Sequence, residues 1–436
     1  MPKFMDLELA NACYKLMHDL IQVKKGESVL ITVDSKAEFR VVEEMAKAAE
    51  VLGAKTMVAW HSTPKGYGAL TMPYLPDPLI ACVDKTDVWV EMNDQWLLYS
   101  PIWDKAVTNG RTRQVMLGGL SVERIVRCIG EVDLEVQQAF QNRLAAMTKQ
   151  AKKMRITNGA GTDVTFENDP NRPVANECDY SFAGGHFLLG QIGWAPKEDT
   201  IHGVIAFDGT ISGGGEAELG KLAEPVRYIV KEGRIQEIQG GEQADILRAY
   251  YKKLDDPNMY IAAHVCYGVN PNARLEGCTT EDERVWGSTQ WGFGHQGSCY
   301  SGGAPRSAKS HIDGICLNCT IYIDDVMILE NGKYVEPELK ALAEKPAKSR
   351  GCPRRHWLKN WENSMTKIKV CADPFPPYQY VDKDGSIKGK DYELVVSRLR
   401  AAGYDPEVCI AEWDRIYREF QAGEQDVLFQ AQDSPE

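Results

Sequence analysis

The sequence contains no run of about 18 apolar residues, so it predicts no transmembrane helix. Basic residues are in the minority: 50 Lys and Arg stand against 62 Asp and Glu, and the net charge of −12 argues against a nucleic-acid or anionic-membrane partner. The first residues, MPKFMDLELANACYK, lack the apolar core of a signal peptide. Twelve cysteines are scattered without a compact framework, which is typical of a reducing compartment. Together these features predict a cytoplasmic protein.

Several familiar catalytic and binding motifs are also missing. There is no His-Glu-x-x-His and no Gly-x-Ser-x-Gly, which are the signatures of two common hydrolase classes. The glycine-rich stretch SGGGEAE (212–218) lacks the Lys-Ser/Thr ending of a phosphate-binding loop and is interpreted as a turn. A single Cys-x-x-Cys, Cys316 and Cys319, leaves a structural zinc site as a minor alternative, in which Cys266, Cys278 or Cys299 would complete the ligands.

The hydrophobic pattern divides the 436 residues into parts of different character. Residues 1–150 alternate helical patterns with short apolar runs, which predicts an α/β domain with a parallel sheet. Residues 151–345 are rich in short strands and glycine turns, which predicts a β-rich α+β domain with one clear helix near 242–253. A basic, proline-containing linker is expected at 346–365, followed by a small α/β segment at 366–436.

Histidine is scarce, and three of the chemically useful side chains fall on two predicted strands. In SAKSHIDGICLNC (307–319), His311 and Asp313 are two residues apart and would point to one face of a strand. His264 ends the strand-like run YIAAHV, directly before a Gly-Val-Asn-Pro turn. Two imidazoles and one carboxylate form the facial triad that holds ferrous iron in oxygenases. Spacing alone leaves this interpretation open beside an ordinary buried histidine, because a domain of this size commonly contains such residues.

Five stretches, in order, resemble the thermophilic leucyl aminopeptidase (aminopeptidase T) family: GTDVTFE, LLGQIGWAPKEDTIHGVIAFDGT, HVCYGVNPNARL, EDERVWGSTQWGFG and GGAPRSAKSHIDG. The resemblance implies that residues 1 to about 345 share the fold of that family. The metal-binding glutamates of those two-metal peptidases are replaced here by Gln191 and His264, and one of their histidines is replaced by Gln290. The loss of anionic bridging ligands argues against a two-metal site.

The altered set is similar to that of the 2,5-dihydroxypyridine 5,6-dioxygenase family, which is built on the same fold. The resemblance implies one Fe(II) per chain, bound by His264, His311 and Asp313, and opening of a hydroxylated pyridine or related aromatic ring by O₂. We expect Glu177 and His186 to move protons. The expected substrate contacts are Gln191, Trp194, Gln290, His295, Tyr300 and Ser301. Trp286, Trp291 and Phe293 are further candidates for the wall of an aromatic pocket, although at least half of these aromatic residues are expected in the core.

Residues 366–436 resemble the opening lobe of an amino-acid-type extracellular solute-binding protein. A lone half cannot close around a ligand, so we interpret it as a docking module or oligomer contact of a homo-oligomeric enzyme. A lid over the metal pocket, formed by Asp373–Tyr378 and Tyr380, is an alternative. Two other functions remain open: a metal-dependent aminopeptidase, and a non-enzymatic protein that binds a small ligand.

Overall fold

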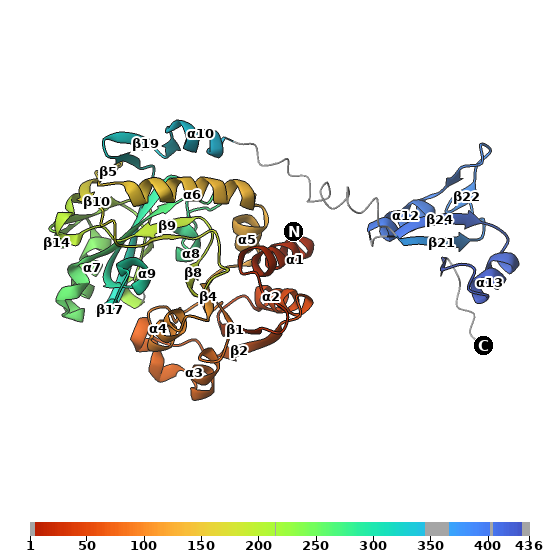
Figure 1. Cartoon of the computed structure of the whole chain (residues 1–436), viewed down its shortest axis with the longest axis horizontal. Coiled ribbons are helices and arrows are strands. Elements are labelled where there is room, and N and C mark those ends of the chain that lie inside the picture. The colour runs from red at the N-terminus through yellow and green to blue at the C-terminus, as the bar shows by residue number, and fades with distance from the viewer. Residues whose placement is uncertain (1–4, 214, 345–365, 402–403, 430–436) are drawn as a thin grey trace. The chain divides into compact units, whose positions relative to one another are not determined.

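The computed structural model describes residues 5–213, 215–344, 366–401 and 404–429. The chain divides into two compact units, Met1–Lys348 and Ser349–Glu436 (Figure 1). The predicted linker at 346–365 lies outside the described residues. No helix in the described ranges is both long enough and apolar enough to cross a bilayer.

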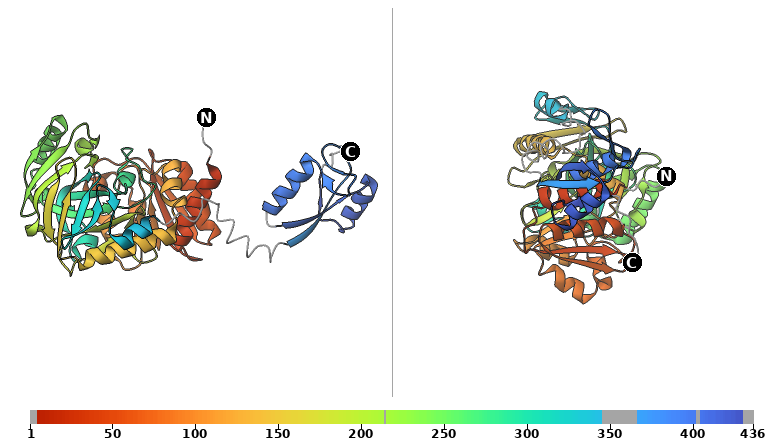
Figure 2. Two further views of the ribbon diagram at one scale, coloured as in Figure 1. Left: turned by 90° about the horizontal axis from the view of Figure 1, so that it is seen from above. Right: turned by 90° about the vertical axis from the view of Figure 1, so that its right-hand side faces the viewer.

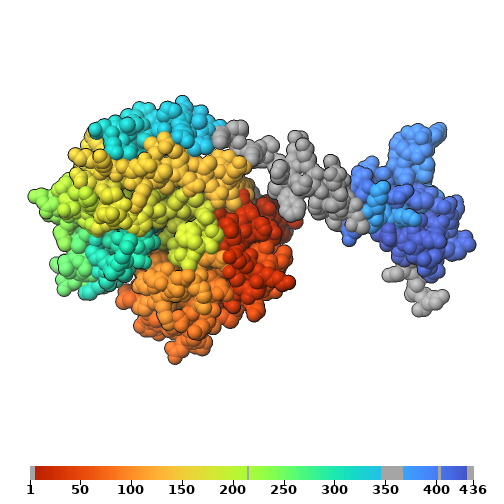
Figure 3. Space-filling view, viewed as in Figure 1, coloured from red at the N-terminus to blue at the C-terminus, as the bar shows by residue number. Residues whose placement is uncertain are grey.

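A five-stranded parallel sheet forms the first part of the larger unit, as the alternating pattern predicted. Its order is β2 (Lys55–His61), β1 (Ser28–Asp34), β3 (Val88–Glu91), β4 (Arg113–Met116) and β8 (Gly184–Phe187). The α-helices of this part are α1 (Asp6–Lys15), α2 (Phe39–Val51), α3 (Asp77–Val83), α4 (Pro101–Thr108) and α5 (Val122–Ile125). The edge strand β8 comes from the predicted second domain, and Figure 3 shows this later segment seated against the first. The two parts therefore share a sheet.

Two antiparallel sheets form the rest of the larger unit. One has the order β14 (Arg234–Gln239), β13 (Val226–Lys231), β10 (His202–Phe207), β6 (Asp163–Glu167), β5 (Lys153–Thr157), β18 (Thr320–Ile323), β19 (Val326–Glu330), β20 (Lys333–Tyr334). The other has the order β12 (Gly220–Lys221), β11 (Thr210–Ser212), β17 (Arg306–Cys316), β16 (Ser288–Gln296), β15 (Ala262–Gly268), β9 (Gln191–Trp194), β7 (Val174–Asn176). The predicted β-rich α+β class is confirmed.

One apolar core joins the inner faces of these two sheets. It is built from alternate residues of the strands, among them Phe207, Tyr228, Trp291 and Phe293. The long helix α6 (Leu134–Gln150) adds Phe140 and runs beside α10 (Pro337–Ala343), as Figure 1 and Figure 2 show. The other α-helices of this part are α7 (Glu242–Leu254), α8 (Thr279–Asp282) and α9 (Ser298–Ser301).

The smaller unit is a separate α/β segment, as predicted. Its parallel sheet has the order β24 (Tyr404–Ile410), β21 (Thr366–Ala372), β25 (Val427–Leu428), and β22 (Tyr380–Val381) pairs with β23 (Ile387–Lys388). Its helices are α12 (Lys390–Ala401) and α13 (Trp413–Gln421). Val370, Ala372 and Phe429 form its small apolar core.

A buried ion pair ties the two parts of the larger unit together. Arg127, in the helical turn that follows α5, donates from Nε to Glu281 Oε1 at 2.6 Å and from Nη2 to Glu281 Oε2 at 2.5 Å. Glu281 lies in α8, and its side chain is fully buried. The paired guanidinium therefore offsets the free-energy cost of burying this charged carboxylate.

Replacing Arg127 with leucine should lower the free energy of unfolding by about 3 kcal/mol, because Glu281 would lose its bidentate partner and keep the backbone N–H of Arg274 and the longer contact with Arg124 Nε, at 3.4 Å. Chemical denaturation followed by circular dichroism measures the loss. The matched control is Arg155→Leu, since Arg155 forms an equally bidentate pair with Asp163 at 2.8 Å on the exposed surface. The control should change stability little. Equal losses in the two variants would contradict the structural role of the buried pair.

Candidate metal centre

Strand pleat and register bring His264, His311 and Asp313 together on one face of the second antiparallel sheet. On β15, His264 points away from the core, opposite to its neighbour Val265, and on β17 His311 and Asp313 flank the core residue Ile312. The middle strand β16 pairs Gly292 with His264 on one side and with Asp313 on the other. The three side chains therefore converge above β16, the strand that separates β15 from β17.

The ligand atoms of these residues form a small triangle. The Nε2 atoms of His264 and His311 are 3.1 Å apart, His311 Nε2 lies 2.9 Å from Asp313 Oδ1, and His264 Nε2 lies 3.6 Å from the same oxygen. Neighbouring ligands of an octahedral ion with bonds of about 2.1 Å are separated by about 3.0 Å. All three residues are buried, and the described part of the chain holds no other such cluster of His, Cys, Asp or Glu. The triad fits a metal ion.

Hydrogen bonds and burial prepare these groups to bind a cation. His311 Nδ1 donates to the backbone carbonyl of His295 at 2.6 Å, which makes Nε2 the nitrogen that would bind a metal once its proton is displaced. Burial lowers the pKa of His264 to about 3, so its ring is neutral. Burial opposes the charge on Asp313, but the neighbouring His311 outweighs it and lowers the pKa of this carboxyl. Two neutral imidazoles and a carboxylate are therefore presented when a metal displaces the proton of His311.

Gly292 provides the space in which the ligands converge. A Cβ atom at this position would lie 2.4 Å from His264 Nε2 and 2.8 Å from His311 Cε1. Any side chain would therefore occupy the gap between the two imidazoles. Gly292 was not among the predicted site residues, since a lone glycine in a strand gives no chemical signal.

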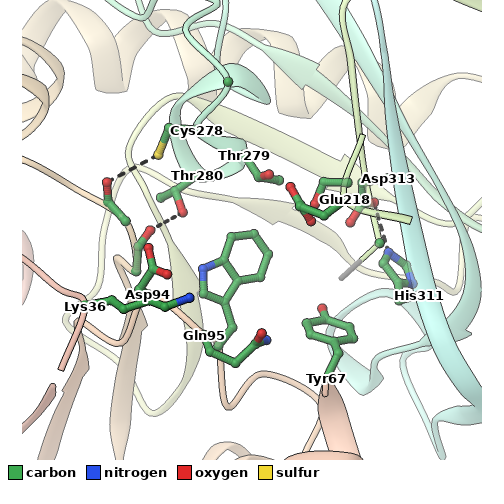
Figure 4. Close-up of a pocket in the computed structure, with 16 residues that line it drawn as sticks. Lys36, Tyr67, Asp94, Gln95, Glu218, Cys278, Thr279, Thr280, His311 and Asp313 are labelled. Atoms are coloured by element: carbon green, nitrogen blue, oxygen red, sulfur yellow. Dashed lines mark hydrogen bonds and ion pairs between the residues drawn. The ribbon is translucent and has the colours of Figure 1, made fainter. Parts of the chain in front are cut away.

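Two cavities adjoin the triad. The larger, about 290 Å³, has His311, Asp313 and Tyr67 at one end and Lys36 and Asp94 at the other (Figure 4). This volume admits a small aromatic ring. The smaller, about 20 Å³, is lined by residues that include His264, Asp313, Trp96, Tyr99 and Tyr300. The larger cavity thus lies between the antiparallel sheet and loops of the parallel sheet.

The aromatic walls from the first part of the chain were missed in the sequence. Trp96 and Tyr99 follow β3, and Trp96 lines both cavities. Loops at the carboxyl ends of parallel strands commonly form binding sites, and this rule, applied to the short apolar run that forms β3, would have pointed to both residues. Tyr99 has a left-handed backbone conformation (φ 61°), and its ring packs against His295 and His311.

Only some of the predicted substrate contacts line a cavity beside the triad. Gln191, Gln290 and Tyr300 line the smaller cavity, and Tyr300 packs against the His264 ring with centroids 4.4 Å apart. His295 is buried beside Tyr99. Trp194 faces the core, because it lies three residues from Gln191 on the same strand, and its indole donates to Asn168. Ser301 is half-buried and bonds to the carbonyls of nearby residues in its own turn.

Glu177 and His186 form a pair of their own beside the site. His186 Nδ1 lies 3.7 Å from Glu177 Oε2, and its Nε2 donates to the carbonyl of Phe182 at 2.9 Å. Glu177 also accepts from the backbone N–H of Phe187, which lines the smaller cavity. Both ring nitrogens of His186 therefore face protein atoms, and neither Glu177 nor His186 lines a cavity at the triad.

The zinc alternative has no geometric support. Cys319 Sγ donates to the carbonyl of Cys316 at 3.2 Å, and both thiols lie in the apolar core. Neither cysteine belongs to a ligand cluster in the ranges that the structure describes. We correct this alternative to a pair of buried thiols, and the eleven described cysteines are all unbridged.

The fold and the site together indicate a metal-binding protein. It combines a parallel α/β sheet with two antiparallel sheets, and its described residues hold one buried cluster of two histidines and one aspartate, which suits a single metal ion. The chain belongs to the 2,5-dihydroxypyridine 5,6-dioxygenase family, because the model of that family matches residues 9–336. Residues 368–436 match the model of bacterial extracellular solute-binding proteins, family 3. Both resemblances expected from the sequence are confirmed.

Individual relatives agree with this assignment. The 2,5-dihydroxypyridine 5,6-dioxygenase of Pseudomonas putida is 25% identical over 352 residues, which cover 73% of this chain and 94% of that protein. The solved 2,5-dihydroxypyridine dioxygenase of Pseudomonas putida KT2440 has a TM-score of 0.62 and 21% identity, covering 76% of this chain and 98% of the other. AmpT from Thermus thermophilus has a TM-score of 0.56 and 13% identity, covering 76% and 100%. The structural comparisons show the fold and confirm its predicted class.

Replacing Gly292 with alanine should remove metal binding, because the added methyl group would occupy the space between the two imidazoles. The protein is loaded with Co(II) and desalted, and its metal content is measured by elemental analysis. The content should fall from about one ion per chain in the wild type to about a tenth of an ion or less in the variant. Gly303→Ala is the matched control, since Gly303 is exposed and an added Cβ there meets no atom within 4 Å. Full metal content in Gly292→Ala would show that the ion binds elsewhere.

Proposed function

We propose that this protein opens a hydroxylated pyridine, 2,5-dihydroxypyridine or a close relative, with O₂ at one Fe(II) held by His264, His311 and Asp313. The triangle of their ligand atoms is the observation that carries the proposal. Membership of the dioxygenase family supports the reaction class. A ferrous ion bound by two histidines and one carboxylate supplies open positions for both a hydroxylated ring and dioxygen.

The side chains around the larger cavity support binding of a flat, hydroxylated ring. Burial raises the pKa of Tyr67 well above its ordinary value, so the phenol keeps its proton and can donate a hydrogen bond to a ring oxygen. Trp96 offers an apolar surface on which a ring can stack. Tyr67 and Trp96 therefore orient the substrate beside His311 and Asp313.

A single metal ion is favoured over the peptidase-type pair. Two of the positions where the resembling peptidases carry metal ligands hold Gln191 and Gln290, whose amides are neutral and bond to each other at 3.1 Å. A second cation would lack an anionic bridge there. A metal-dependent aminopeptidase is accordingly disfavoured, and it would be recognised by two metal ions per chain and hydrolysis of leucyl p-nitroanilide.

We also infer where the enzyme is located and how it assembles. The eleven unbridged cysteines support a reducing, cytoplasmic location. We infer a homo-oligomer, with the solute-binding-like segment as a docking module or oligomer contact. The third function considered, a non-enzymatic ligand-binding protein, would consume no O₂ with any ring compound.

Replacing His264 with alanine should lower kcat for O₂-dependent ring opening by at least about 100-fold, because the iron would lose one of three protein ligands. Oxygen-electrode traces with 2,5-dihydroxypyridine after anaerobic loading with Fe(II) measure the rate. His202→Ala, at an exposed histidine on β10, should leave the rate unchanged. Retained activity in His264→Ala would show that this residue is not a metal ligand. If the wild type reacts with another hydroxylated ring but not with 2,5-dihydroxypyridine, the proposed substrate is wrong and the reaction class stands.

We further propose that Glu177 and His186 act together in proton transfer, with protonated His186 as the acid. Burial lowers the pKa of His186, but the charge of Glu177, 3.7 Å away, and the hydrogen bond to the carbonyl of Phe182 outweigh this effect and raise the pKa above its ordinary value of 6.5. A histidine acid works below its pKa, so activity should fall as pH rises through that raised value. Their mutual contact supports this role. Because neither residue lines a cavity at the triad, His186 must release one of its two protein contacts before its proton can reach the substrate.

The variant Glu177→Gln should lower the pKa of His186 and move the alkaline limb of the kcat/KM profile to lower pH, by on the order of one unit. The rate is measured from about pH 5 to pH 10 on the iron-loaded enzyme. Glu237→Gln, an exposed carboxylate on β14, is the control. A profile that does not move in Glu177→Gln would exclude this pair as the acid.

A further inference from the structure

A continuous chain of side-chain hydrogen bonds ends on the carboxylate of Asp313. Arg284 Nη2 donates to Gln191 Oε1 at 3.0 Å, and Gln191 Nε2 donates to Gln290 Oε1 at 3.1 Å. Gln290 Nε2 in turn donates to Asp313 Oδ1, the oxygen that faces both imidazoles. We call Gln191 and Gln290 the amide relay. It links β9 and β16 to the triad strand β17.

The direction of every bond in this chain is fixed by its two ends. A guanidinium can only donate, so Gln191 must present its oxygen to Arg284 and its nitrogen to Gln290. An ionised carboxylate can only accept, so Gln290 must present its nitrogen to Asp313. The second hydrogen of Gln191 Nε2 points to Glu283 Oε2 at 3.3 Å. Gln191 therefore has no donor left for a substrate, despite its place at the smaller cavity.

Burial makes the chain rigid. Arg284 is fully buried, Gln191 is 2% exposed and Gln290 is 1% exposed, so water cannot replace a lost bond at little cost. The guanidinium is also held by the carbonyl of Leu188 and by Glu283. A fixed cation thus anchors one end of the relay, and the metal-facing oxygen of Asp313 lies at the other.

We propose that Gln191 and Gln290 are positioning residues that act in series to hold Asp313 Oδ1 toward His264 and His311. This inference rests on the proposed metal site and goes beyond it, because it assigns to two residues a role in metal affinity. Gln290 touches Asp313 directly, and Gln191 acts through Gln290 by fixing the orientation of its amide. The relay is specific to amides, since a carboxylate at either position would set acceptor against acceptor.

The test compares Co(II) binding in wild type, Gln191→Leu, Gln290→Leu and the double variant, by competition with a chelator. Gln290→Leu should bind Co(II) about 10–100-fold more weakly, as expected when a bond to a ligating carboxylate is removed. Gln191→Leu should be weaker than wild type, and the double variant should match Gln290→Leu within about twofold, because residues in series are not additive. The visible absorption of bound Co(II) should shift in all three variants.

Two further variants separate positioning from stability. Gln114→Leu removes a buried amide of the parallel sheet that bonds Trp103 and Glu91, and it should leave Co(II) affinity and absorption unchanged. Gln290→Met keeps the side-chain length without the donor, and it should reproduce the loss if Gln290→Leu fails to fold.

The outcomes distinguish the relay from the metal site itself. If wild type binds no Co(II), the proposed metal site fails. If wild type binds it and Gln290→Leu and Gln290→Met bind equally well with an unchanged spectrum, the relay is overturned. Losses that add in the double variant would overturn action in series.

Discussion

The register of three antiparallel strands is the constraint on which the site depends. β15 and β17 carry the candidate ligands, and β16 between them has to offer a residue without a side chain where their imidazoles meet. A shift of one residue in any of these strands would turn its polar side chains into the apolar core. Trp291 and Phe293 oppose such a shift, because they fill the core from alternate positions of the same strand as Gly292.

The candidate metal ligands and the walls of the cavity come from different parts of the chain. The antiparallel sheet supplies the triad, whereas the loop after β3 in the parallel sheet supplies Trp96 and Tyr99. The shared strand β8 and the buried pair of Arg127 with Glu281 fix one part against the other. The distance between the aromatic walls and the candidate metal ligands is therefore set by these two connections, as the proposed reaction of an oriented ring with O₂ would require.

Much of the fold could be predicted from the sequence, because hydrophobic periodicity is local. The i, i+2 spacing of His311 and Asp313 placed both on one strand face, but the grouping with His264 stayed open until the family resemblance supported it, since pairing between distant strands leaves no local signal. The same alternation that puts Gln191 at the site turns Trp194 into the core, which a list of aromatic residues could not reveal. Gly292 and Arg284 were missed because their importance depends on what packs against them.

The most direct test of a single ion held by this triad is anomalous X-ray scattering from crystals loaded with Fe(II) under anaerobic conditions, recorded on both sides of the iron edge. The account predicts one iron peak per chain, bonded to the Nε2 atoms of His264 and His311 and to a carboxylate oxygen of Asp313. Two peaks per chain, or one peak that contacts none of these atoms, would contradict it.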